Sequence, residues 1–108
     1  MLCSPTVYAI AIIRYRRPLE EVLAVLDEHR AYLGSLHARG TLLASGPFEP
    51  RSGGALLLRV ADGAELDAVR DDDPYVRKGI AQYELQPWAP TYGRDSLDAI
   101  APPPQSFP

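Results

Sequence analysis

The sequence predicts an α+β domain in which one antiparallel sheet carries two helices on a single face. Two observations indicate this class: the element order strand, helix, strand, strand, helix, strand, and a change from a strand-like to a helical apolar period early in the chain. The 108 residues are 46% hydrophobic and 23% charged, which suits one globular core of modest size.

The first strand and the longest helix are the clearest elements. Residues 7–13 are nearly all apolar, which predicts a strand central in its sheet. Pro18 supplies a helix-compatible φ, and Glu20 and Glu21 follow at the positive end of the helix dipole. Gly40 is placed to end this helix. The helix is predicted to have one continuous apolar face, comprising Leu19, Val22, Leu23, Leu26, His29, Leu33 and Leu36.

Two further strands, joined by a turn, follow this helix. Residues 41–45 predict a second strand that ends at Gly46 and Pro47, because proline cannot donate to a ladder and glycine permits a bend. Residues 51–54 are turn-forming types, so residues 55–60 predict a third strand in a hairpin with the second.

The remaining elements are a short helix, a helical turn and a last strand. Asp62 and Glu65 are spaced as a variant of the capping box, which predicts the start of the second helix. Asp73 and Pro74 cap a brief helical turn. Residues 82–88 then alternate between polar and apolar types, as in a half-exposed strand.

This order of elements is the ferredoxin-like βαββαβ arrangement. Its helices would leave the other face of the sheet open to water, so we expect two copies to pair their sheets face to face as a homodimer. Residues 1–89 are assigned to this domain. Residues 90–108 are rich in proline and are expected to form a tail, or an arm that wraps a partner.

Composition narrows the classes of partner. A net charge of −3 without a clustered basic surface argues against nucleic-acid binding. No apolar run is long enough to suggest a membrane partner. Cys3 is the only cysteine, which excludes an internal disulfide and suits a reducing compartment, so a cytoplasmic location is expected.

His29 and Asp73 are the candidate catalytic residues. A titratable ring on an apolar helix face and a carboxylate fixed at a helix start can exchange a proton with a ligand if the fold brings them together. His29 could instead be a core residue satisfied by a backbone carbonyl, and Asp73 could serve only as a helix cap. The two roles of Asp73 are compatible, since a cap bond would occupy one carboxylate oxygen and leave the other for the imidazole.

Neither a metal nor a cofactor is expected to bind. The two histidines of the chain, His29 and His37, lie about 80° apart around the helix, and the one cysteine is remote from both. The glycine pairs do not follow the pattern of a phosphate-binding loop.

Two motifs resemble those of a known family. The run from His29 to Pro47, HRAYLGSLHARGTLLASGP, resembles the signature of the YciI-like, or YCII-related, family. Asp73-Pro74-Tyr75 resembles the second motif of that family. Together with the element order, the resemblance covers about residues 6–89 and excludes the C-terminal tail.

The resemblance implies a dimeric α+β barrel with a histidine–aspartate pair at its pocket, a pair that His29 and Asp73 would form here. Ser45 would lie at the pocket edge in such a fold, where it could donate a hydrogen bond to the substrate or be merely a small residue at the end of a strand. The glycine and proline after it most simply end the strand and shape the pocket wall. Tyr75 could be a packing residue, but it follows Asp73 within one turn and is therefore expected to contact the ligand. The residues expected to bind substrate are Ser45, Gly46, Pro47 and Tyr75.

Some members of the family act as dehalogenases or hydrogen-halide lyases on chlorinated aromatic or lactone intermediates. We therefore expect a cofactor-independent lyase or isomerase that performs acid–base chemistry on a small cyclic or aromatic oxygenated molecule. One alternative is a non-catalytic dimeric module that binds a small ligand or supports a larger enzyme system. Another is an oxygenase, acting without a cofactor or with haem.

Overall fold

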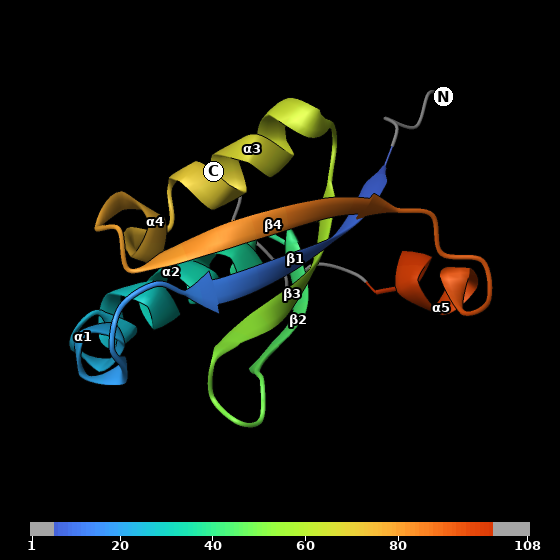
Figure 1. The fold of residues 1–108 in the computed structure, drawn as a ribbon. Coiled ribbons are helices and arrows are strands. Elements are labelled where there is room, and N and C mark those ends of the chain that lie inside the picture. Colours follow the sequence, from blue (N-terminus) through green and yellow to red (C-terminus); the bar gives the residue numbers. More distant parts are fainter. Residues whose placement is uncertain (1–5, 101–108) are drawn as a thin grey trace.

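A computed structural model of the chain describes residues 6–100. Figure 1 shows one sheet with helices along one side and a further short helix beyond the end of the last strand. The elements in chain order are β1 (Val7–Tyr15), α1 (Leu19–Ala24), α2 (Leu26–Ala38), β2 (Leu42–Pro47), β3 (Gly53–Val60), α3 (Gly63–Asp71), α4 (Pro74–Arg77), β4 (Ala81–Trp88) and α5 (Arg94–Asp98).

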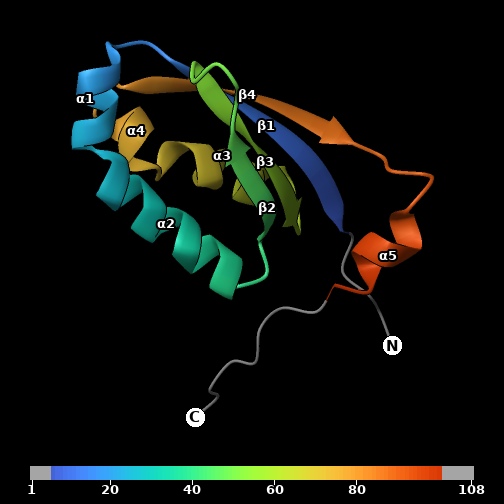
Figure 2. The ribbon, with the colours of Figure 1, turned by 90° about the horizontal axis from the view of Figure 1, so that it is seen from below.

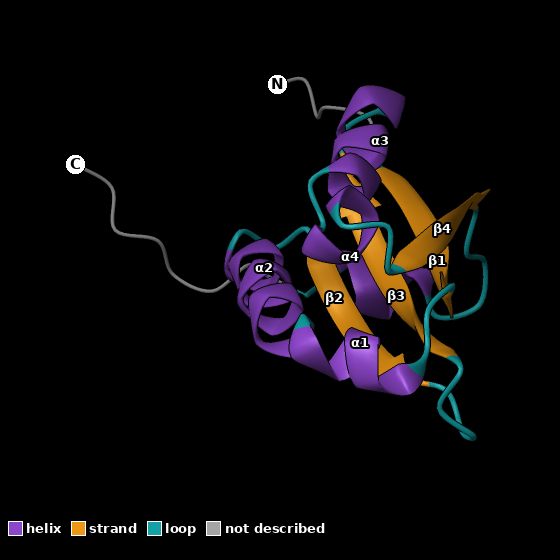
Figure 3. Ribbon diagram, turned by 60° about the vertical axis from the view of Figure 1, so that its left-hand side comes forward, coloured by secondary structure: helices purple, strands orange, loops and turns teal. Residues whose placement is uncertain are grey.

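The four strands form a sheet in the order β2-β3-β1-β4, and every neighbouring pair is antiparallel. The predicted ferredoxin-like α+β fold is therefore confirmed, and the apolar first strand does lie inside the sheet. Helices α2 and α3 cover the same face, as Figures 2 and 3 show from two sides. Within residues 6–100, the opposite face of the sheet carries no helix except α5 at one end.

The core fills the space between the sheet and these helices. Alternate residues of β1 and β3 point into it, because side chains along a strand alternate between faces. Leu66 and Val69 of α3 are buried, as the capping-box helix predicts, and Asp62 caps that helix by accepting from the Glu65 N–H at 2.9 Å. The sheet contributes Ala9, Ala11, Ile13, Leu56, Leu58 and Val60 to this core.

The predicted long helix is in fact two helices, and this prediction was wrong in one respect. The chain tightens at Val25, whose N–H bonds to the carbonyl of Val22 three residues earlier. The break turns the apolar face, so Val25 is buried while Leu19 and Leu23 are 45% and 48% exposed. Gly40 ends α2 as predicted, with a φ of 81° that suits glycine.

The second strand extends two residues beyond Ser45 and ends at Pro47, so the predicted end at Gly46 and Pro47 is confirmed. β2 is an edge strand, so one side of its backbone needs no ladder partner and proline is tolerated there. Pro47 pairs with Gly54 of β3, and Ser45 pairs with Leu56 on the face that the helices cover. This extension matters because it brings the end of β2 alongside the candidate site.

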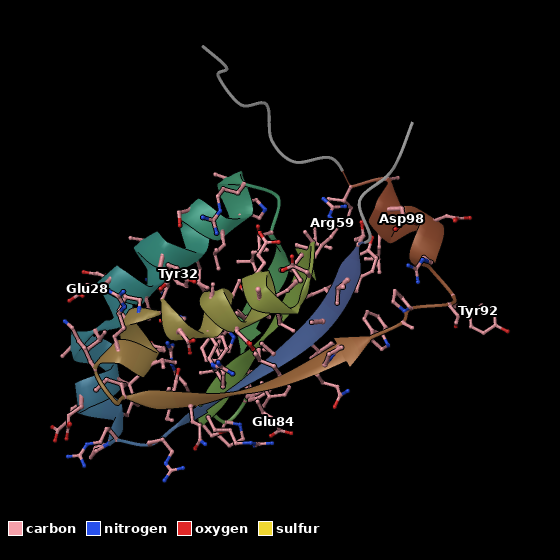
Figure 4. All side chains as sticks on the ribbon, turned by 90° about the horizontal axis from the view of Figure 1, so that it is seen from above. Glu28, Tyr32, Arg59, Glu84, Tyr92 and Asp98 are labelled. Atoms are coloured by element: carbon pink, nitrogen blue, oxygen red, sulfur yellow. The ribbon has the colours of Figure 1, made fainter. Side chains whose placement is uncertain are left out.

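The chain beyond Ala89 includes α5, which the sequence reasoning did not anticipate. The Tyr8 hydroxyl donates to Asp98 Oδ1 at 2.6 Å, and Arg59 donates to the Leu97 carbonyl at 3.2 Å. Figure 4 shows Arg59 and Asp98 side by side at this end of the sheet. Residues 101–108, which carry most of the prolines expected in an extended arm, lie outside the described residues. No helix within residues 6–100 is both long and apolar enough to span a bilayer.

Candidate active site

Asp73 is held rigidly at the centre of the candidate site by its place at the start of α4. It is the N-cap of α4, where its Oδ1 accepts from the Tyr75 N–H at 2.8 Å and Pro74 occupies the first helical position. The side chain is 0% exposed. Its neighbours Asp71 and Asp72 are exposed and paired with arginines, which identifies Asp73 as the inward carboxylate of the three.

The structure brings His29 to this carboxylate. Nδ1 of His29, on α2, lies 2.9 Å from Asp73 Oδ1 although the two residues are 44 positions apart. An ionised carboxylate only accepts hydrogen bonds, so we place the imidazole proton on Nδ1, which leaves Nε2 for a ligand. One detail of the sequence reasoning was wrong: the cap bond and the imidazole share Oδ1 instead of dividing the two oxygens.

The second carboxylate oxygen of Asp73, Oδ2, accepts a hydrogen bond from the hydroxyl of Tyr83 on β4. Burial, followed by the negative charge of Asp73, raises the pKa of Tyr83 above its ordinary value of 10.0. With His29, the Tyr75 amide and Tyr83 as donors, the buried carboxylate is fully satisfied. A carboxylate held by three donors cannot swing, so it fixes the imidazole that it contacts.

The ring of Tyr75 packs against one face of the His29 imidazole. The two rings are stacked, with centroids 3.9 Å apart and an interplanar angle of 8°. The rings of Tyr15 and Tyr75 meet edge to face with centroids 6.0 Å apart. Because the ring of His29 is gripped at one edge by Asp73 and on one face by Tyr75, its orientation is set before any ligand binds.

A cavity of about 210 Å³ lies against these residues. It is large enough for a substituted six-membered ring, since a cavity of ~150 Å³ accommodates benzene. Asp73 is not part of the wall and acts from behind His29. The apolar wall comprises Ile13, Leu26, Leu33, Ala55 and Leu56. The remaining lining residues are Tyr15, His29, Arg30, Ser45, Gly46, Pro47, Arg51, Gly53, Gly54 and Tyr75.

The cavity therefore contains each residue that the sequence suggested for substrate contact, namely Ser45, Gly46, Pro47 and Tyr75. Sequence reasoning missed Tyr15, Arg51 and Tyr83. Tyr83 carried a signal, because it belongs to the alternating pattern that predicts the last strand, and it is buried in the structure. Arg51 carried none, since a turn arginine has no period and its direction depends on the hairpin.

His37, the other histidine, lies on an exposed part of α2 and does not line this cavity. Within the described range, no three His, Cys, Asp or Glu side chains come together in a group that could hold a metal ion. Of the two histidines, His29 is the one that lines the cavity and is hydrogen-bonded to Asp73.

Comparisons with known proteins agree with this fold. The solved structure of 5-chloro-2-hydroxyhydroquinone dehydrochlorinase (TftG) from Burkholderia phenoliruptrix AC1100, in complex with 2,5-dihydroxybenzoquinone, has the same fold with a TM-score of 0.65. The alignment covers 78% of this chain and 96% of that one at 20% sequence identity. No curated protein sequence matches the chain. The family model described as YCII-related domain matches residues 8–89, so the chain belongs to the YCII-related family.

Proposed function

We propose that the protein is a small-molecule enzyme in which His29 and Asp73 carry out acid–base chemistry on a small cyclic or aromatic oxygenated compound. The observation that carries this proposal is the buried hydrogen bond between Nδ1 and Oδ1, 2.9 Å long, at the wall of a ring-sized cavity. The reaction class is a lyase or isomerase step, including elimination of the dehalogenase type.

The chemistry follows from the free nitrogen of the ring. Nε2 of neutral His29 accepts a proton from a carbon or hydroxyl of the substrate, and Asp73 stabilises the imidazolium that forms. In an elimination, the electron pair left by that proton forms a new double bond while chloride departs with the electrons of its own bond. One proton and one chloride are released, so the step is balanced without a change in the enzyme.

The wall residues have matching roles in this proposal. Ser45 offers a hydroxyl for a substrate oxygen, while Gly46 and Pro47 shape the wall beside it. Tyr75 forms a flat surface against the imidazole. The likeness to a dehydrochlorinase solved with a dihydroxybenzoquinone supports a quinone-like or hydroxylated ring as the class of substrate.

Release of chloride from 5-chloro-2-hydroxyhydroquinone and from other chlorinated hydroxyquinones tests the proposal. His29→Ala should lower the rate by about 10²-fold or more, because it removes the group that transfers the proton. Asp73→Asn should lower it as well, with circular dichroism to show that the variant is folded. His37→Ala, which alters an exposed histidine on the same helix, is the matched control and should keep the full rate.

Two results would contradict catalysis by this pair. Turnover that persists in folded His29→Ala would remove His29 from the chemistry. Tight binding of these rings with no turnover in the wild-type protein would instead favour the non-catalytic ligand-binding module.

We also propose that two copies pair through the sheet face opposite α2 and α3. Ile10 and Ile12 of β1 and Leu57 of β3 point to that face and are only half-buried in the single chain. Glu84 of β4 lies on the same side, so polar residues border the apolar strip. Burying such a strip against its own copy removes it from water.

Sedimentation equilibrium checks this arrangement. The wild-type protein should sediment as a dimer, and Ile12→Asp should yield monomers because a charge would be buried against its own copy. Ala31→Asp introduces the same charge on the exposed side of α2 and should leave the dimer intact. A monomeric wild-type protein at micromolar concentration would contradict the pairing.

We also propose a cytoplasmic location for the protein. The presence of a single cysteine in the chain supports it, because such a chain suits a reducing compartment.

A further inference from the structure

Three polar side chains of the cavity wall come from distant parts of the chain and meet one another. Arg51, in the turn between β2 and β3, donates through Nε to the Tyr15 hydroxyl at 3.2 Å. Tyr15 ends β1 and packs edge to face on Tyr75 of α4. All three residues line the same cavity as His29.

The Tyr75 hydroxyl is the unexplained member of this group. Tyr75 is 1% exposed, and its oxygen is buried without a hydrogen-bond partner among residues 6–100. Burial raises the pKa of Tyr75 to about 12, with the Tyr15 hydroxyl adding to the rise and Arg51 opposing it, which places all three groups within mutual influence. A buried donor left unpaired costs free energy, so a ligand oxygen that accepts from it would recover that loss.

The charged side chains that line the cavity are all positive. Arg30 and Arg51 line it, and no Asp or Glu does. Among the described residues Arg51 forms no ion pair, although five other arginines do. The buried carboxylate of Asp73 lies behind His29 and already accepts hydrogen bonds from three donors. The free positive charge at the wall therefore favours a negatively charged ligand.

We propose that Arg51, Tyr75 and Tyr15 form a subsite for an anionic oxygen on a planar ring, such as a carboxylate, phenolate or enolate. This inference rests on the proposed function, because it names the substrate class of the same cavity. Hydrogen bonds from charged or preorganised donors to an oxyanion are stronger than those to a neutral oxygen. The subsite would hold negative charge on the ring while Nε2 of His29 exchanges a proton with a neighbouring atom.

Calorimetric titration with benzoate and with benzamide tests the preference for an anion. The two probes have the same shape and differ in charge, so benzoate should bind about tenfold or more tightly. Arg51→Gln and Tyr75→Phe should each reduce benzoate binding by about tenfold while changing benzamide binding little. Arg39→Gln, at another exposed arginine outside this cavity, should change neither.

Titration with 4-nitrophenol gives a spectroscopic reading and distinguishes a phenolate from a carboxylate. Binding to the wild-type protein should lower the pKa of the dye and increase its yellow phenolate absorbance, and Tyr75→Phe should weaken that increase. A response to the phenolate without benzoate binding would assign the subsite to ring oxygens rather than carboxylates.

Equal affinity for benzoate and benzamide together with uptake of neutral nitrophenol would overturn the subsite. So would a failure of all three compounds, benzoate, benzamide and 4-nitrophenol, to bind. None of these measurements needs turnover. A selective anion site in a protein whose His29→Ala variant loses no activity would leave the subsite standing and remove the proposed acid–base role. If His29→Ala loses activity but the wild-type protein shows no selectivity for anions, the acid–base role stands and the subsite is removed.

Discussion

Two tyrosines beside Asp73 have opposite energetic roles. The Tyr83 hydroxyl satisfies a buried carboxylate oxygen, whereas the Tyr75 hydroxyl is buried with no partner in the described part of the chain. The same chemical change, removal of one hydroxyl, should therefore have different consequences at the two positions.

We predict that Tyr83→Phe lowers the free energy of unfolding by about 1.5–3 kcal/mol, because Asp73 Oδ2 loses its donor while it stays buried. Tyr75→Phe should leave the free energy unchanged or raise it by up to about 1 kcal/mol, since an unpaired buried group is removed. Urea unfolding of the two variants and the wild type measures this difference. Equal losses in both variants would show that Tyr75 has a structural partner.

His29 and Asp73 could be singled out from local patterns, and the residues that surround them could not. A histidine on an apolar helix face and an aspartate before proline each stand out in the sequence. The stack of Tyr75 on His29 depends on the angle between α2 and α4, which no local pattern encodes. The meeting of Arg51 with Tyr15 depends on how the β2–β3 hairpin bends toward the end of β1.

Among the helices and strands, the β2–β3 hairpin and α2 contain glycines with contrasting surroundings. A Cβ added to Gly54 would lie 2.6 Å from the Gly46 carbonyl oxygen, so the close approach of the two strands requires glycine. A Cβ added to Gly34, on the exposed side of α2, would meet nothing within 4 Å.

Gly54→Ala should lower the free energy of unfolding by about 1–3 kcal/mol, because the backbone at the cavity wall must shift. Gly34→Ala should raise it by about 0.5–1 kcal/mol, since alanine is the better helix former. Thermal unfolding of both variants tests whether the free energy of unfolding changes in opposite directions. A neutral Gly54→Ala would mean that the hairpin separates without cost.

The limits of element prediction lie at breaks and short helices. The sequence placed the strands, α3 and the end of α2 correctly, because alternation, capping residues and Gly40 act locally. The break between α1 and α2 at Val25 could not be predicted, because the sequence around it contains no glycine or proline. Helix α5 spans five residues, too few for an apolar period, and it is held by contacts of its Asp98 and Leu97 with β1 and β3.

For the whole molecule, buried tyrosines couple stability to alkaline pH. The pKa of Tyr83 is raised in the folded state by burial and by Asp73, whereas in the unfolded chain it returns to about 10. A raised folded-state pKa gives stabilisation that is complete below pH ~10 and is lost as pH rises above that value.

The free energy of unfolding should therefore fall as pH rises above ~10, by up to about 1.4 kcal/mol per pH unit for each such group. Tyr83→Phe should make this decline shallower, while Tyr92→Phe, at a fully exposed residue, should not. Urea unfolding from pH 9 to pH 11 measures the slopes. Identical slopes in wild type and Tyr83→Phe would show that Tyr83 ionises as readily in the folded protein as in the unfolded chain.

The proposed chemistry requires that Asp73 hold the proton of His29 on Nδ1 and that Nε2 face the ligand. Long-range ¹H–¹⁵N correlation spectra of the labelled protein, recorded with and without 2,5-dihydroxybenzoquinone, report both nitrogens directly. We predict a neutral ring protonated on Nδ1 in the free protein, a shift of the Nε2 resonance when the ligand binds, and loss of the Nδ1–H preference in Asp73→Asn. A ring protonated on Nε2 whose resonances do not respond to bound ligand would contradict the proposed function.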